Sequence, residues 1–126
     1  MDKNIISTTN APGAIGPYSQ AIEANGFVFI SGQLAIDPAT GEFKAGTIEE
    51  QTEQALKNLK AIAEAAGCSL SDVVKTTVFL TDMGNFAAMN GVYAKFFTTD
   101  CPGRSAVQVA ALPKGAIVEV EAIIAK

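Results

Sequence analysis

The sequence predicts one α+β domain spanning residues 1–126, in which two helices cover a single face of a mixed β-sheet. Three observations indicate this class. The length is that of one domain. Hydrophobic residues make up 48% of the chain, which supplies a core without disulfide or metal support. Strand-like and helix-like stretches follow one another in the order β-β-β-α-β-α-β-β, and two helices can cover only one face of the sheet.

The first part of the chain predicts a short strand, a loop and a hairpin. Residues 3–7 favour a strand, and residues 11–17, rich in Gly, Pro and Ala, favour a loop. A hairpin is predicted over 21–30, because the Asn-Gly pair at 25–26 is typical of a type I′ turn with two positive φ angles. The Asp-Pro-Ala-Thr-Gly sequence at 37–41 predicts a further turn.

Two helices follow. The Thr-Ile-Glu-Glu sequence at 47–50 is a capping box and predicts the start of the first helix. Apolar residues then recur at helical spacing as far as Ala66, and Gly67 supplies the stop. A second helix is predicted after Asn85, a capping residue, and ends before Pro102. Its apolar stripe comprises Phe86, Met89, Tyr93, Phe96 and Phe97.

Three further strand-like runs complete the predicted sheet. Residues 73–80 are rich in β-branched side chains and follow a turn capped by Ser71 and Asp72. The runs at 105–110 and 117–125 are joined by a Leu-Pro-Lys-Gly turn, and we expect these two strands to pair with each other.

The predicted sheet is apolar on both faces. Residues 27–30 read Phe-Val-Phe-Ile, and the last strand carries Ile117 and Ile123 on the same face as Glu119 and Glu121. Since two helices cover one face only, the other face needs a partner. The sequence therefore predicts a homo-oligomer whose sheets meet at the interface. The alternative is that the strand boundaries lie one or two residues from those predicted, which would change the faces of these side chains.

Charge and hydropathy argue against several kinds of partner. The net charge is −4 and the lysines are scattered, unlike the basic stripe of a nucleic-acid binder, so no nucleic-acid partner is expected. No apolar run approaches the ~18 residues of a membrane span, and residues 1–6 lack the pattern of a secretory signal. Cys68 and Cys101 lack the spacing of a metal or redox site. We expect a reduced, cytoplasmic protein that binds no membrane.

The chain contains no histidine. Ser-His-Asp and Cys-His catalysis are therefore excluded, as are zinc sites built on histidine or on a cysteine cluster. The acids show no calcium-loop spacing and no glycine-rich phosphate loop occurs. We expect no metal and no cofactor. Chemistry must come from carboxylates, Tyr, Ser, Thr, Cys, Lys, backbone groups and one arginine.

That arginine, Arg104, is the strongest candidate for a binding residue. The other basic residues are all lysines, and Arg104 stands directly before an apolar strand. A guanidinium offers a planar, permanently charged fork that grips a carboxylate at two points, which a lysine cannot do. The alternative is a structural ion pair at the surface, which is the commoner role of arginine.

Three further groups of residues could carry chemistry. Glu119 and Glu121 lie on one strand face among isoleucines, where burial perturbs proton affinity and suits acid–base work; a solvent-facing edge strand is an equal alternative. Tyr18, in a Gly-Pro-Tyr-Ser segment, could line a pocket or simply pack. Ser31-Gly32 directly follows a buried strand and predicts either a bulge or a close backbone approach to a ligand.

With these residues the chain closely resembles the RidA family of reactive-intermediate deaminases. The resemblance runs in order through nearly the whole chain. It is carried by Ile15-Gly-Pro-Tyr-Ser-Gln-Ala21, Ser31-Gly-Gln33, Glu64-Ala-Ala-Gly67, Val74-Lys-Thr-Thr-Val-Phe-Leu80, Arg104-Ser105, Leu112-Pro-Lys114 and Glu119-Val-Glu-Ala122.

The resemblance implies a chorismate-mutase-like fold, a homotrimer and three sites in the clefts between subunits. It also implies hydrolysis of 2-imino acids, or their enamine tautomers, to 2-keto acids and ammonia. Arg104 would hold the substrate carboxylate and Glu119 would position or deprotonate water. Tyr18 and Asn90 match pocket positions of the family, and Ser31 and Gly32 are expected to line the pocket.

Two positions depart from the family pattern. Ala106 stands where many members carry a cysteine, so that cysteine is not required here, and Gly103 stands where Ala, Thr or Ser is commoner.

Two other functions compete with the deaminase. A non-catalytic trimer that binds keto acids or proteins would need Arg104 but not Glu119. Ribonuclease activity is disfavoured by the acidic balance and the absence of histidine.

Overall fold

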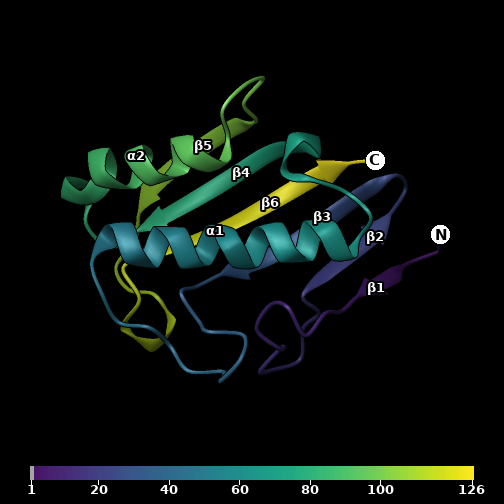
Figure 1. Cartoon of the computed structure of the whole chain (residues 1–126), viewed down its shortest axis with the longest axis horizontal. Helices are drawn as coiled ribbons and strands as arrows, with labels where there is room; N and C mark the ends of the chain where they lie inside the picture. Colours follow the sequence, from purple (N-terminus) through teal and green to yellow (C-terminus); the bar gives the residue numbers. More distant parts are fainter. Residues whose placement is uncertain (1) are drawn as a thin grey trace.

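The computed structural model describes residues 2–126, and its elements follow the predicted order. The six strands form one sheet in the order β1-β2-β3-β6-β4-β5 (Figure 1). The elements are β1 (Asn4–Ile6), β2 (Ala21–Ala24), β3 (Phe27–Gln33), α1 (Ile48–Ala65), β4 (Val73–Leu80), α2 (Phe86–Phe96), β5 (Gly103–Gln108) and β6 (Val118–Ala125). Short 3₁₀ turns lie at Leu70–Asp72, Met83–Asn85 and Pro113–Gly115.

The locally encoded elements form as predicted. Asn25 and Gly26 have φ of 54° and 80° and join the antiparallel strands β2 and β3. The capping box is complete at the start of α1: Thr47 Oγ1 accepts from the Glu50 amide at 3.1 Å, and Glu50 Oε1 accepts from the Thr47 amide at 3.0 Å. Gly67, with φ of 77°, ends that helix region.

Two caps differ from expectation. Asn85 stands at the N-cap of α2, but its side chain makes no capping hydrogen bond. Instead, Asp82 Oδ1 accepts from the Gly84 amide at 2.8 Å, within the 3₁₀ turn that precedes the helix. Before β4, Asp72 caps the turn by accepting from the amide of Ser69 at 2.9 Å. Ser69, rather than Ser71, is therefore its backbone partner.

The prediction that the last two strands pair with each other was wrong. β6 lies between β3 and β4 and is antiparallel to both, whereas β5 forms a parallel ladder with β4 at the sheet edge. The α2 crossover makes this parallel pairing possible. β6 alternates buried and half-buried residues along its whole length, which suits a central strand, while β5 is exposed at most positions, which suits an edge.

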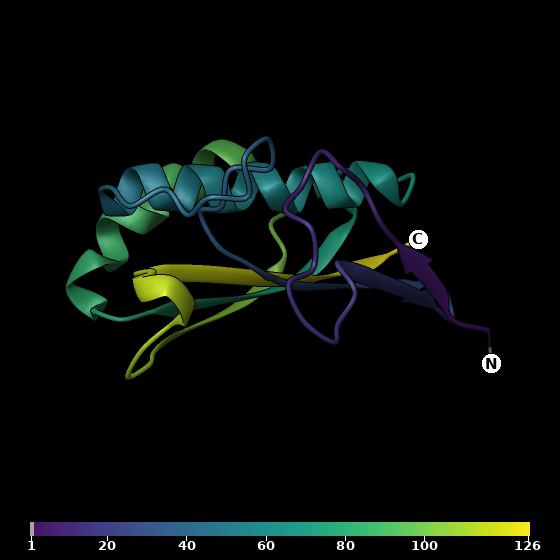
Figure 2. The same cartoon turned by 90° about the horizontal axis from the view of Figure 1, so that it is seen from below.

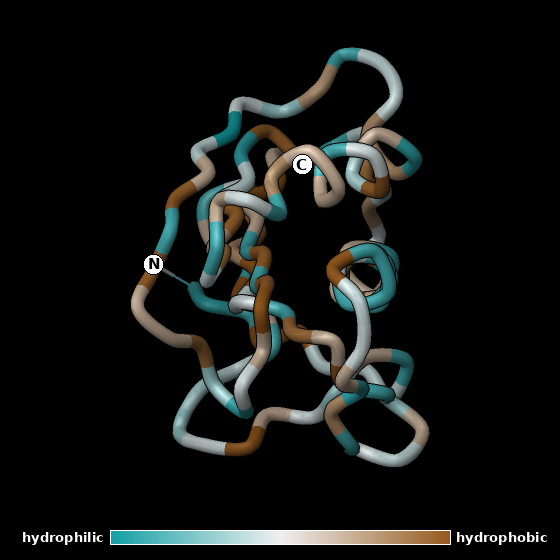
Figure 3. Tube along the Cα trace, turned by 90° about the vertical axis from the view of Figure 1, so that its left-hand side faces the viewer, coloured by the Kyte–Doolittle hydropathy of each residue, from teal (hydrophilic) through white to brown (hydrophobic). Residues whose placement is uncertain are grey.

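Both helices cover the same face of the sheet, as predicted (Figure 2). Val118, Val120, Ala122 and Ile124 of β6 face the helices and are at most 3% exposed. In the end-on view of Figure 3 the strands carry much of the hydrophobic colour. On the other face Phe27 and Phe29 remain 42% and 45% exposed. This uncovered side, which we call the open face, is the surface from which the oligomer was predicted.

Candidate functional site

The structure places Arg104 and Glu119 on opposite faces of the sheet. Glu119 lies between the buried Val118 and Val120 and therefore points to the open face. Arg104 pairs across the parallel ladder with Thr76, whose buried hydroxyl bonds to Tyr93 of α2, so Arg104 faces the helices. One chain thus presents two separate half-sites, which we call the Glu119 cleft and the Arg104 cradle.

The Glu119 cleft has a volume of about 440 Å³. It brings together four of the six predicted site residues: Tyr18, Ser31, Gly32 and Glu119. Its remaining wall is largely apolar, with a second carboxylate at the rim. The other lining residues are Pro12, Gly13, Ile15, Gln20, Gln33, Leu34, Ile36, Pro113 and Glu121.

Gly32 lies directly against the Glu119 carboxylate. The β3–β6 pairing shifts register between Ile30 and Gln33, so a bulge forms where the sequence suggested one. A Cβ atom on Gly32 would lie 2.7 Å from Glu119 Oε2 and 2.8 Å from its Cδ. The missing side chain therefore makes room for the carboxylate, which is a close approach of backbone to a neighbouring side chain rather than to a ligand.

The electrostatics of the cleft favour a protonatable Glu119. Partial burial raises the pKa of the Glu119 carboxyl above its ordinary value, and the negative charge of Glu121 on the same strand face raises this pKa further. A carboxyl with this environment is a competent acceptor of a proton from water and a donor to a leaving group.

The loop that carries Tyr18 is fastened by Ser31 and Gln20. The Ser31 hydroxyl donates to the Ser19 carbonyl at 2.6 Å, and its amide donates to the Gln20 carbonyl at 3.0 Å. The predicted binding residue Ser31 is thus also a structural clamp. Tyr18 is half exposed, and its hydroxyl accepts from the Ile15 amide at 3.4 Å.

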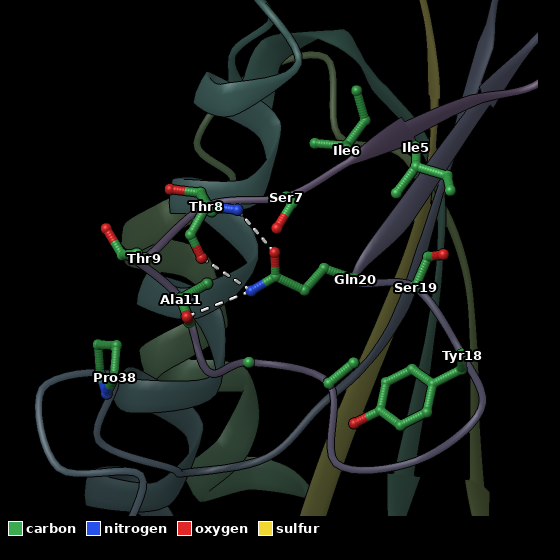
Figure 4. Close-up of a pocket in the computed structure, with 12 residues that line it drawn as sticks. Ile5, Ile6, Ser7, Thr8, Thr9, Ala11, Tyr18, Ser19, Gln20 and Pro38 are labelled. Carbon is green, nitrogen blue, oxygen red and sulfur yellow. Dashed lines mark hydrogen bonds between the residues drawn. The ribbon is translucent and has the colours of Figure 1, made fainter.

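Gln20 is buried and reaches back to the N-terminal segment (Figure 4). Its Oε1 accepts from the Thr8 amide at 2.7 Å. Its Nε2 lies within donating distance of the carbonyls of Thr8, Ala11 and Pro12, at 3.0, 3.2 and 2.7 Å. This clasp ties the segment before the Tyr18 loop to the start of β2 and so fixes one wall of the cleft.

Two more buried amides, both on α1, hold other irregular segments in the same way. Asn58 Nδ2 donates to the carbonyls of Leu34 and Ile36, at 3.0 and 2.9 Å, which are cleft residues. Gln51 donates to the Gly46 carbonyl at 3.2 Å and accepts from the Ile117 amide at 3.1 Å. The frame of the cleft is therefore built on uncharged side chains that bond to backbone.

The Arg104 cradle lies under α2. Arg104 Nη1 donates to Asn90 Oδ1 at 2.7 Å. Its Cζ stands 4.8 Å from the ring centroid of Tyr93 and 5.4 Å from that of Phe86. An adjoining hollow of about 480 Å³ is lined by Asn90, Tyr93, Ala94, Phe97, Cys101, Pro102 and Arg104. The two remaining predicted residues, Arg104 and Asn90, are thus in direct contact.

Arg104 has no acidic partner in the part of the chain that the structure describes. Within 2–126 the ion pairs are Lys44 with Asp37, at 3.9 Å, and Lys126 with Glu23, at 3.2 Å. Arg104 is half-buried, and its guanidinium bonds to one amide and lies over two aromatic rings, so no acidic group within 2–126 offsets its charge. Such a group can bind an external anion.

Sequence reasoning missed Gln20, Phe86 and Tyr93 as parts of the site. The sequence pattern places Phe86 and Tyr93 on one apolar helix stripe, and the structure shows that the Arg104 Cζ also lies over their rings. The available signal was their spacing with Asn90, which puts all three on one helix face. Gln20 gave no local signal, since its partners lie 8 to 12 residues away.

Two simple features bear on the class of protein. Among residues 2–126 no helix is long and apolar enough to cross a membrane. No group of three or more His, Cys, Asp or Glu side chains in the same residues is arranged to hold a metal ion. The fold and site therefore define a small α+β protein with a carboxylate cleft and an unpaired arginine.

Comparisons with known proteins identify the family. The family model described as "Endoribonuclease L-PSP" matches residues 8–126. The RutC family protein y4sK of Sinorhizobium fredii is 62% identical over 119 residues, which are 94% of each chain. The 2-iminobutanoate/2-iminopropanoate deaminase of Mus musculus is 51% identical over 96% of this chain and 90% of its own.

A solved structure of Escherichia coli TdcF with bound serine is 48% identical and superposes with a TM-score of 0.93, covering 98% of both chains. The chain belongs to the family that these proteins share, the L-PSP/RutC/RidA family, as the resemblance of its sequence implied.

Proposed function

We propose that the protein is a 2-imino acid deaminase that works as a homotrimer of single-domain chains with sites between subunits. Water adds to the C=N carbon of a 2-imino acid, the resulting tetrahedral amine is protonated, and ammonia leaves as the carbonyl of the 2-keto acid forms. The protonated imine is a strong electrophile, so the enzyme needs only to orient it and a water molecule. No histidine or covalent nucleophile is required.

The observation that carries the proposal is the unneutralised charge of Arg104. A half-buried cation without an acidic partner is best explained by a ligand that supplies the negative charge. A 2-imino acid has one carboxylate, and the guanidinium fork matches it at two points. Asn90, which accepts from Nη1, sets the direction of the fork.

Glu119 supplies the second role. Its raised pKa, in a partly apolar cleft, suits a group that takes a proton from the attacking water and returns it to the departing nitrogen. Tyr18, Ser31 and Gly32 line the same cleft and would orient the imine. Gly32 leaves the room that the Glu119 carboxylate occupies.

The separation of the half-sites supports a site shared between chains. Arg104 and Glu119 lie on opposite faces of one sheet, so a single chain cannot offer both to one small substrate. A neighbouring copy would have to bring β5, the edge strand that carries its own Arg104, to the Glu119 cleft. The exposed Phe27 and Phe29 supply apolar area for such packing, in the chorismate-mutase-like trimer that the family resemblance implies.

The relatives support the substrate class. The mouse protein carries the name 2-iminobutanoate/2-iminopropanoate deaminase, and the TdcF structure holds serine, a small molecule with an amino-acid carboxylate. The family model's description as an endoribonuclease favours a second candidate function. Against it stand the net charge of −4, which argues against a basic RNA-binding surface, and the absence of histidine, which leaves no imidazole for RNA cleavage.

A coupled assay tests the proposal. A threonine dehydratase generates the imine, and its decay is followed with the parent protein and with Glu119→Gln. The parent should accelerate decay. Glu119→Gln should lose most of the turnover while binding 2-ketobutyrate almost unchanged, because the amide keeps the size but cannot accept a proton. Equal acceleration by both proteins would overturn the role of Glu119.

The same samples report on assembly. Light scattering at micromolar concentration should give three times the mass of the 13.0 kDa chain. A mass near that of one chain, with full activity, would refute the shared site. If no acceleration occurs but 2-ketobutyrate binds, the non-catalytic binding module becomes the correct function.

A further inference from the structure

We propose that Phe86 and Tyr93 are positioning residues for Arg104, whose aromatic faces take the place that an acidic side chain usually holds beside a half-buried arginine. This inference rests on the proposed function only in one respect, namely that the positioned guanidinium binds the carboxylate of the substrate.

The geometry of the cradle carries the first step. Phe86, Asn90 and Tyr93 recur at positions i, i+4 and i+7 of α2 and so share one face of the helix. The two rings stand 5.4 and 4.8 Å from Arg104 Cζ, and the amide between them accepts from Nη1. Among the residues that the structure describes, these two are the rings over which the Arg104 Cζ lies.

The second step concerns the N–H donors of the Arg104 guanidinium that the aromatic contacts leave free. A guanidinium carries its five N–H donors in its plane, so contacts made through its faces consume none of them. Asn90 accepts one of these donors. The remaining N–H groups stay available for a bidentate carboxylate. An aspartate or glutamate in the same position would have occupied the fork and cancelled its charge.

The third step is the rigidity of the Tyr93 ring. Its hydroxyl lies 2.7 Å from the hydroxyl of Thr76 on β4, in a buried position. Its ring packs on Phe97 with a centroid distance of 4.6 Å. Burial raises the pKa of the Tyr93 phenol, with the Thr76 bond and the Arg104 charge acting in the opposite direction, so the group is neutral at working pH. A fixed ring fixes the plane of the arginine stacked on it.

Nuclear magnetic resonance can test the stacking directly, because Arg104 is the only arginine. The Nε–Hε group of the Arg104 side chain therefore gives a single cross-peak whose assignment is known. In the folded protein the ring currents should displace this peak from its position in the urea-unfolded chain. Phe86→Leu should move it back toward the unfolded position, and Phe86→Tyr, which keeps the ring, should leave it near the parent position. Phe96→Leu is the matched control on the same helix.

Affinity for 2-ketobutyrate is the functional readout. Phe86→Leu should bind it about tenfold more weakly, the loss expected for one partly desolvated cation–π contact. Phe86→Tyr and Phe96→Leu should bind it within about twofold of the parent. A merely structural role of Phe86 would give equal affinities for the leucine and tyrosine variants at equal thermal stability, and that result would overturn the inference.

The two proposals can fail separately. If 2-ketobutyrate does not move the Arg104 peak of the parent, the carboxylate-binding function is wrong, whatever the variants do. If the peak has the same position in folded parent, Phe86→Leu and unfolded chain, the cradle is wrong even when the keto acid binds. The folded-against-unfolded comparison needs no variant and remains decisive should Phe86→Leu fail to fold.

Discussion

The Arg104 cradle and the Glu119 cleft differ in how the fold treats a charged group. Arg104 is surrounded by two ring faces and an amide, which fix the cation without neutralising it. Glu119 stands beside a second acid, Glu121, and against the bare backbone of Gly32, and its pKa is raised. One environment preserves a permanent charge, whereas the other makes a charge easier to remove.

This difference matches two chemical tasks. A group that anchors a carboxylate has to stay charged throughout the reaction, and an arginine among uncharged neighbours does so. A group that moves a proton has to change its charge, and a carboxyl whose pKa is raised accepts a proton more readily than an ordinary one. Neither half-site contains the opposite charge in the described chain, so a substrate would complete both.

The largest effect should come from Arg104→Lys. The lysine keeps the charge but loses the planar two-point grip and the stacking on Tyr93. Losing a charged hydrogen bond costs roughly 1.5–3 kcal/mol, and misplacing the reacting carbon adds a factor of about 100 in rate. The coupled imine assay should show a loss near the limit of detection, with an unchanged assembly mass. A rate close to that of the parent would make Arg104 a structural residue.

The separation of the half-sites can be tested by mixing two inactive variants. Arg104→Lys and Glu119→Gln chains are unfolded together at equal amounts and refolded. If each site takes Arg104 from one chain and Glu119 from its neighbour, about a quarter of the sites in a random mixture are intact. Activity should rise from near zero to about that fraction. Failure to regain activity, with mixed oligomers present, would place both residues in the same chain's site.

A smaller effect is expected from Gly32→Ala. The new methyl group would stand within 3 Å of the Glu119 carboxylate, which must move. The fold tolerates the change, because the obstructing atoms are the end of a flexible side chain. Turnover should fall roughly ten- to hundredfold with little change in keto-acid affinity. Gly91→Ala, where nothing lies within 4 Å, is the control and should keep the parent rate.

The smallest effect, a shift along the pH axis, should come from Glu121→Gln. Glu121 raises the pKa of Glu119, so its removal lowers that pKa. Turnover, which needs ionised Glu119, should then persist to lower pH. The acid limb of the pH–rate profile should therefore shift to lower pH, while the rate at neutral pH changes little. If the acid limb does not shift, the fall in rate at low pH is caused by the protonation of a group other than Glu119.

The same variant has a predicted effect on stability, with a definite sign. A carboxyl whose pKa is raised by folding binds its proton more tightly in the folded state, so its contribution to stability falls as pH rises. Glu121→Gln relieves this repulsion where both acids are ionised. Its melting temperature should therefore exceed that of the parent at pH 7 by more than at pH 4.

The sequence predicted most elements well where the signal was local, although the caps at Asn85 and Ser71 differ. The capping box at Thr47, the turn at Asn25 and the stop at Gly67 act within a few residues, and all three form. The position of β6 between β3 and β4 depends on pairings between distant segments, which no local pattern specifies, and the expected β5–β6 pair was wrong.

The candidate site shows the same division. The residue types of Arg104 and Glu119 could be recognised from their rarity and their strand pattern. Their placement on opposite faces of one sheet could not, because it depends on the register of β5 against β4 and on the contact of Arg104 with α2. The role of Gly32 likewise became visible only through its distance to Glu119.

The three buried amides, Gln20, Gln51 and Asn58, give the cleft an electrically neutral frame. Their bonds to backbone neither titrate nor weaken when salt screens surface charge. The walls of the cleft should therefore keep their positions across conditions in which the carboxyls of Glu119 and Glu121 change their charge. A change of rate with acidity or ionic strength would then report on the reacting groups themselves, and not on loosening of the loops around them.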